Sequence, residues 1–116
     1  MFLLQEKGVA TQEVAIYFIG SRKITQLHAE FFNDPTPTDC ITFPFGGQLL
    51  GEILVCPKAA LDYNPQKPYE ETTLYIIHGL LHLLGYDDID SKKRALMRRE
   101  EKRLMALARK HRCIIS

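Results

Sequence analysis

Cysteine is scarce in this chain of 116 residues, and its three copies do not form the pattern of a disulfide scaffold. Cys40, Cys56 and Cys113 are an odd number, and no two of them form a CxxC pair. Small secreted domains that depend on disulfides carry an even, closely spaced set. The cysteines therefore exclude a secreted disulfide scaffold and indicate a reducing compartment.

The sequence also lacks a long hydrophobic run. Its longest apolar stretch, residues 74–84, has 11 residues and includes two histidines, whereas a membrane-spanning helix needs about 20 apolar residues. The apolar residues 1–4 are followed at once by Gln5, Glu6 and Lys7, so no secretory signal develops. We therefore expect a cytoplasmic protein that has no membrane partner.

Positive charge is unevenly distributed, although the net charge is only +1. Residues 91–116 contain ten Lys or Arg against two Glu, and residues 1–90 contain five against twelve acidic residues. A basic end on an acidic domain suggests a phosphate-rich partner. A solvated helix face explains the same charges, and from charge alone it is the favoured interpretation.

Hydrophobic residues make up 46% of the chain, enough for a buried core, and the length suits one domain over residues 1–116. Hydrophobic periodicity and turn residues predict the following elements: strand 14–19, a helix that Ser21 caps and that ends at about residue 33, strand 40–45, strand 49–56, a helical turn over 57–61, helix 68–84 and helix 91–111. Gly46-Gly47 predicts a hairpin between the second and third strands. The fold class that this order predicts is α+β, with a small mixed β-sheet packed with helices.

Two histidines interrupt the apolar helix 68–84. His78 and His82 are four residues apart and therefore stand on one helix face. Gly85 lets the chain leave the helix sharply, which allows Asp88 to return as a third ligand. Two nitrogens and one oxygen leave a fourth tetrahedral position for water, as in a catalytic zinc site. We predict one divalent metal ion, zinc first, on this central buried helix; core histidines with satisfied hydrogen bonds are the alternative.

The same spacing resembles that of metzincin peptidases, but the glutamate that serves as their general base is replaced here by Gly79. Two histidines and one carboxylate also suit a non-haem iron oxygenase, although nothing else in the chain supports one. The residue that moves the proton is not identified. Asp87 is a weak candidate for the base; capping of the last helix or bonding to adjacent backbone amides is its other role, and the cap is favoured.

The segment 78–88 reads HGLLHLLGYDD and resembles the motif HGxLHLxGYDH of the YbeY family, bacterial endoribonucleases of ribosomal RNA maturation. Residues 38–44, TDCITFP, resemble the family's T-[DN]-V-L-S-F-P strand, and residues 50–53, LGEI, resemble its L-G-[DE]-I strand. Met97 and Glu100 fall in the family's M…E helix. The resemblance covers roughly residues 13–108.

This resemblance implies an α+β fold and a zinc-type metal at His78, His82 and Asp88, with no small-molecule cofactor. It further implies metal-dependent cleavage of single-stranded RNA in 16S rRNA maturation and ribosome quality control, with ribosomal RNA and the ribosome as partners. Thr38 and Asp39 either line the site or close a loop. The basic residues that we expect to follow the RNA backbone are Arg94, Arg98, Arg99, Lys102 and Arg103.

The chain departs from the family pattern in three places. Asp88 stands where the motif has a third histidine, and Phe32 stands where the family carries an arginine thought to meet phosphate. Residues 1–12 are too few for the family's first strand and helix, so we expect both to be lacking. Two other functions therefore stay open: a zincin-like metalloprotease, and a non-catalytic, metal-stabilised ribosome- or RNA-binding protein.

Overall fold

The computed structural model describes residues 13–46 and 49–110, which form a mixed sheet and four helices. The elements are, in chain order, β1 (Glu13–Phe18), α2 (Ser21–Phe32), β2 (Cys40–Pro44), β3 (Leu49–Val55), α3 (Pro57–Tyr63), α4 (Pro68–Leu83) and α5 (Ser91–Lys110). The strands lie in the order β1-β3-β2, with β1 parallel and β2 antiparallel to β3. The predicted α+β class and the predicted hairpin are confirmed.

Several expectations fall on residues that the structure does not describe: Gly47 in the hairpin turn, His111 at the end of the last helix, and residues 1–12. The expected cap at Ser21 is wrong. Ser21 is already helical, the N-cap position belongs to Gly20, and no side chain caps the helix there. Within the described residues, no helix is long and apolar enough to cross a membrane.

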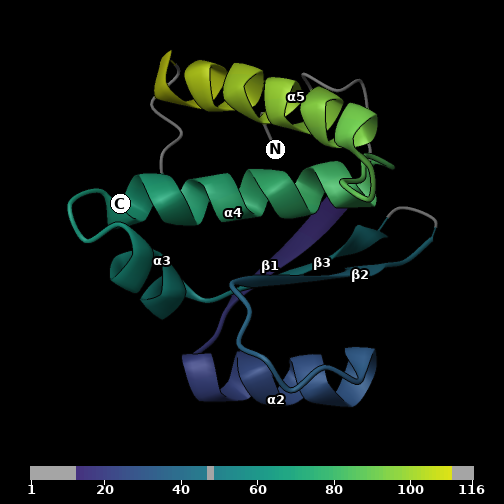
Figure 1. Ribbon diagram of the computed structural model, residues 1–116, viewed down its shortest axis with the longest axis vertical. Helices are drawn as coiled ribbons and strands as arrows, with labels where there is room; N and C mark the ends of the chain where they lie inside the picture. The colour runs from purple at the N-terminus through teal and green to yellow at the C-terminus, as the bar shows by residue number, and fades with distance from the viewer. Residues whose placement is uncertain (1–12, 47–48, 111–116) are drawn as a thin grey trace.

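The helices form layers on both faces of the sheet. Figure 1 shows α4 over one face, α5 on the outer side of α4, and α2 along the opposite face. The sandwiched position of α4 explains why its sequence is apolar almost all round. The core on this side consists of Ile53, Val55, Ile76, Ile77, Leu80, Leu81, Met97, Leu104 and Met105. Both candidate histidines therefore lie on the central helix, as the sequence predicts.

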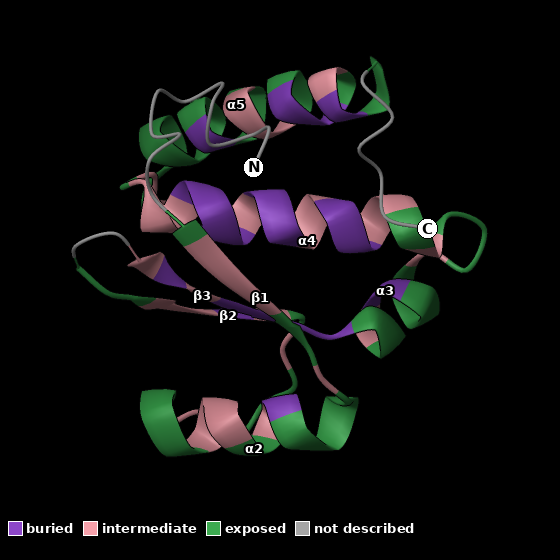
Figure 2. Cartoon of the chain, turned by 180° about the vertical axis from the view of Figure 1, so that it is seen from behind, coloured by how far each residue is buried: buried purple, intermediate pink, exposed green. Residues whose placement is uncertain are grey.

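A second, smaller core lies between α2 and the other face of the sheet. It consists of four buried residues, Ile24, Ile41, Leu54 and Cys56. Only Ile24 of α2 is buried, and Figure 2 shows most of that helix as exposed or intermediate. The sheet is thus supported unequally, by two packed helices on one face and by one lightly packed helix on the other.

Gly79 lets α4 approach the sheet closely. A Cβ atom at this position would lie 2.9 Å from Cγ2 of Ile53 and 3.1 Å from both Sγ of Cys40 and Cγ2 of Thr42. These distances are shorter than normal van der Waals contact, so a side chain at position 79 would push the helix away. The glycine therefore brings the helical turn between the two histidines up against β2 and β3.

Candidate metal centre

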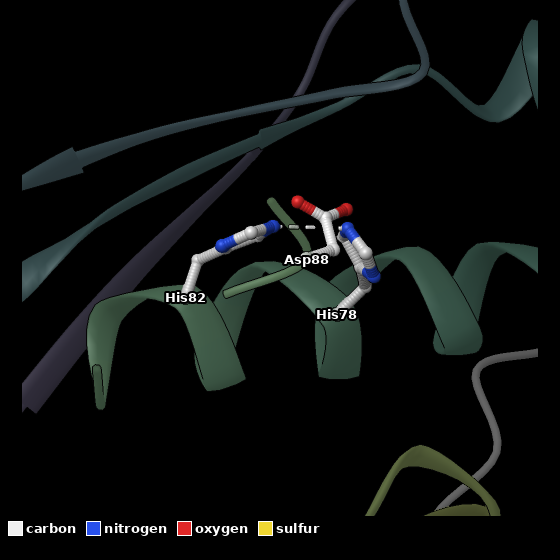
Figure 3. Close-up of side chains that lie close together, drawn as sticks. All are labelled: His78, His82 and Asp88. Atoms are coloured by element: carbon white, nitrogen blue, oxygen red, sulfur yellow. Dashed lines mark hydrogen bonds between the residues drawn. The ribbon is translucent and has the colours of Figure 1, made fainter. Parts of the chain in front are cut away.

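The two histidine side chains converge on one side of α4, as the four-residue spacing predicts. Nε2 of His78 and Nε2 of His82 are 3.1 Å apart, and the ring planes are nearly perpendicular, at 80°. Figure 3 shows the two rings standing on the same side of the helix, with the carboxylate of Asp88 beside them. One nitrogen of each ring thus points toward a shared position.

The end of α4 delivers Asp88 to that position. The amide of Gly85 donates to the carbonyl of His82, and the amide of Tyr86 donates to the carbonyl of Leu81. This pair of bonds forms a Schellman motif, which requires a left-handed residue, and Gly85 supplies it with a φ of 100°. The chain then turns back, so that one ligand atom each from His78, His82 and Asp88 lies within 4.8 Å of the others.

The geometry of these donors fits a divalent metal ion. Two imidazole nitrogens bound to one tetrahedral zinc at about 2.0–2.1 Å lie roughly 3.3–3.4 Å apart, close to the 3.1 Å between His78 and His82. Asp88 is exposed, and the two histidines are half-buried. The cluster therefore resembles an open catalytic site with room for a further ligand more than a closed structural site.

Glu101 of α5 holds the first histidine in place. Nδ1 of His78 lies 2.6 Å from Oε1 of Glu101, and the side chain of Glu101 is 15% exposed. A carboxylate behind a metal-ligating histidine fixes the ring and leaves the lone pair of Nε2 for the ion. The hydrogen bond to Glu101 raises the pKa of His78, with smaller contributions from Asp88 and Asp39, against burial, which lowers it.

The family motif did not identify Glu101 as the carboxylate that contacts His78. Glu100, the residue that falls in the M…E pattern, pairs instead with Arg103, and its side chain is also only 15% exposed. The neighbouring Glu101 faces α4, on the same side of α5 as the buried Met97, Leu104 and Met105. Helical spacing from Met97 and Leu104 places both Glu100 and Glu101 beside this face, so the spacing alone does not select Glu101 as the partner of His78.

A cleft of about 300 Å³ opens beside the two histidines. It crosses the edge of β2 and is lined by His28, Phe32, Thr38, Asp39, Cys40, Ile41, Thr42, His78 and His82. Thr38 and Asp39 therefore line the site, one of the two roles that the sequence left open. Burial raises the pKa of the Cys40 thiol to about 12, so that thiol stays protonated and is a poor nucleophile.

Asp87 has a local structural role. Its Oδ1 accepts a hydrogen bond of 2.8 Å from the amide of Ile89. The helix cap is a different residue, Asp90, whose Oδ1 accepts from the amide of Lys93 at 2.8 Å. Asp87 thus bonds a backbone amide beside it, as one of its expected roles required, while Asp90 caps α5.

The five basic candidates for RNA contact are all exposed on α5. None of them is among the residues that line the cleft. Arg103 pairs with Glu100, whereas Arg98 and Lys102 border a separate hollow between α4 and α5 that also contains Glu70 and Glu71. The structure therefore places these side chains on the surface of α5, apart from the cleft beside the histidines.

The described residues thus form an α+β fold with an open cluster of two histidines and one carboxylate that could hold a metal ion beside a cleft, a combination typical of hydrolases. The family described as "Endoribonuclease YbeY" matches residues 1–109 of this sequence. The chain therefore belongs to the YbeY endoribonuclease family, which confirms the resemblance carried by the HGLLHLLGYDD segment and the expectation of an enzyme.

Individual relatives also support membership of this family. The chain is 44% identical to the endoribonuclease YbeY of Protochlamydia amoebophila over 117 residues, which cover 93% of this chain and 78% of the relative. It is 39% identical to that of Chlamydia trachomatis serovar D, over 93% of this chain and 74% of the relative. The solution structure of TM1509 from Thermotoga maritima matches with a TM-score of 0.61 at 30% identity, covering 89% of this chain and 73% of that one.

Proposed function

We propose that this chain is a metal-dependent endoribonuclease whose divalent ion, zinc first, is held by His78, His82 and Asp88. The observation that carries the proposal is the convergence of these three ligand atoms within 4.8 Å, beside a cleft of about 300 Å³. The relatives are named as endoribonucleases, which supports RNA as the substrate.

The side chains of the site have distinct tasks under this proposal. A divalent ion held by His78, His82 and Asp88 would supply an activated water and a positive charge for a phosphoryl oxygen. His78 and His82 offer neutral imidazole nitrogens, and Glu101 keeps the ring of His78 aligned. Asp88 takes the place of a third histidine and adds a negative charge, so it lowers the net charge of the loaded site by one.

The structure gives a physical reason to prefer RNA cleavage over peptidase activity. A zincin peptidase needs a glutamate directly after its first histidine. Position 79 faces the sheet, where even a Cβ atom would lie 2.9 Å from Ile53, so a glutamate cannot be placed there without moving the helix. Asp87 does not replace it, since its carboxylate already bonds the amide of Ile89.

We further propose that single-stranded RNA reaches the cleft past the basic surface of α5. The side chains involved would be Arg94, Arg98, Arg99, Lys102 and Arg103, all exposed. The family resemblance supports a role in 16S rRNA maturation and ribosome quality control in the cytoplasm, with residues 1–116 acting as one domain. A salt-dependent affinity for single-stranded RNA is expected, because phosphate contacts release counterions.

The test is cleavage of a labelled single-stranded ribosomal RNA fragment, with and without a chelator, beside casein as a peptidase substrate. We expect RNA cleavage that chelation and His82→Ala both abolish, and no cleavage of casein. Chelator-sensitive cleavage of casein alone would favour the peptidase. If zinc raises the melting temperature but no RNA is cut, the non-catalytic alternative is correct.

A further inference from the structure

His28 belongs to the same cleft as the candidate metal ligands, although it comes from the other side of the sheet. It lies on α2, whereas His78 and His82 lie on α4, and Figure 1 shows these helices on opposite faces. They meet at β2, the edge strand, because the cleft passes around that edge. A substrate in the cleft would therefore have the metal ligands on one side and His28 on the other.

The imidazole of His28 is held in a defined orientation. Its Nδ1 lies 2.9 Å from the carbonyl oxygen of Thr36, which can only accept a hydrogen bond, so Nδ1 carries the proton. Asp34 secures this carbonyl, since its Oδ1 accepts from the amide of Thr36 at 3.0 Å and from its hydroxyl at 2.6 Å. The ring atom that remains for a substrate is Nε2.

The chemistry of the cleft leaves His28 a role that its neighbours cannot fill. Phe32 has no proton to donate, Asp39 offers a carboxyl group, and the thiol of Cys40 has a pKa of about 12. His78 and His82 must be neutral to bind a metal ion. Among the lining residues, His28 is thus the side chain outside the metal cluster whose ring can carry a second proton on Nε2 and donate it to a substrate.

We propose that His28 is a catalytic residue that protonates the leaving oxygen of the scissile phosphodiester; this inference rests on the proposed RNA cleavage. The oxygen of a water molecule bonds to phosphorus while the bond from phosphorus to one ribose oxygen breaks. The electron pair of that bond stays on the ribose oxygen, which takes the proton from Nε2 of the imidazolium. The surplus proton of the water passes to solvent, and solvent protonates His28 again.

The variant that tests this role is His28→Asn, in the full chain loaded with zinc. Lys23→Asn is the matched control, because Lys23 is exposed on the same helix and does not line the cleft. General acid catalysis contributes roughly 10²–10⁴-fold, so we expect kcat to fall by that factor in His28→Asn, with KM and bound zinc unchanged. Lys23→Asn should match the unmodified protein.

A second substrate separates proton donation from a structural role. The ends of the RNA products first identify the ribose oxygen that leaves, and a substrate with sulfur in place of that oxygen is then compared. Sulfur leaves without a proton because a thiol is far more acidic than an alcohol, so His28→Asn should cut this substrate nearly as fast as the unmodified protein. A misfolded variant would be slow on both substrates.

The outcomes distinguish this inference from the proposed function. Slow cleavage of the oxygen substrate with normal cleavage of the sulfur substrate is the expected result. Equal loss on both substrates, or no loss on either, would overturn the role of His28 while RNA cleavage itself still stands. If the unmodified, zinc-loaded protein cuts neither substrate, the proposed function fails, and the inference fails with it.

Discussion

The two sides of the sheet differ in how firmly they hold the walls of the cleft. The side covered by α4 and α5 has nine buried core residues, and it carries the three candidate ligands and Glu101. The side covered by α2 has four, and its cleft residue Phe32 is 50% exposed. A metal site needs fixed donor positions, whereas the wall of a substrate cleft can adjust. The candidate ligands accordingly lie on the well-packed side of the sheet, and the opposite wall of the cleft lies on the lightly packed side.

The largest expected effect is on stability and compares one leucine from each side. Leu80 of α4 is fully buried in the larger core, so Leu80→Ala should lower the free energy of unfolding by about 2–5 kcal/mol. Leu27 of α2 is only partly buried, and Leu27→Ala should cost about 1 kcal/mol. Urea denaturation measures both. Equal costs would contradict the unequal support of the two faces.

Zinc should stabilise the protein at pH 8 but not at pH 5. Protons compete with the ion for the two imidazoles. The hydrogen bond to Glu101 raises the pKa of His78, so protons compete for this ring up to a higher pH. At a zinc concentration 100 times Kd, the gain is about 2.7 kcal/mol. Thermal melts with and without zinc measure it, with His82→Ala as the control. An equal gain at both pH values would argue against imidazole ligands.

Glu101→Gln should weaken zinc binding roughly 10–100-fold, because second-shell carboxylates orient their histidine and increase its basicity. Glu100→Gln is the matched control, since Glu100 lies one residue away, is equally shielded from solvent, and pairs with Arg103 instead of a histidine. Competition with a zinc indicator gives both affinities. If the two variants bind zinc equally well, Glu101 does not position His78.

The smallest effect concerns the metal-free protein. The pKa of His78 is raised in the folded state, so its pair with Glu101 stabilises the fold fully below about pH 6.5, the ordinary histidine pKa. That contribution is lost as the pH rises through the higher folded-state pKa. In the presence of a chelator, Glu101→Gln should therefore lower the melting temperature at pH 5.5 and change it little at pH 8.5. The reverse dependence would show that the pair is not ionic.

The sequence predicted the elements and the cluster of candidate ligands because local rules govern both. Helical spacing aligned His78 with His82, and the left-handed preference of Gly85 brought Asp88 back to them. The remaining contacts depend on packing between distant segments. His28 shares a cleft with His78, fifty positions away, only because β2 is the edge strand around which the cleft passes.

Two details of the helices lay beyond the sequence patterns. Ser21 has the right residue type for a helix cap, but α2 begins one residue earlier than that role requires. Glu100 and Glu101 both lie beside Met97 and Leu104 by helical spacing, and only the packing of α5 against α4 shows that Glu101 is the carboxylate that meets His78.

The most direct test of the central claim is elemental analysis of the purified protein after exposure to zinc, beside His78→Ala, His82→Ala and Asp88→Ala. The account predicts about one zinc per chain in the unmodified protein and a loss of that zinc in each variant, as three shared ligands require. No zinc in the unmodified protein, or full zinc in all three variants, would contradict a metal centre at these residues.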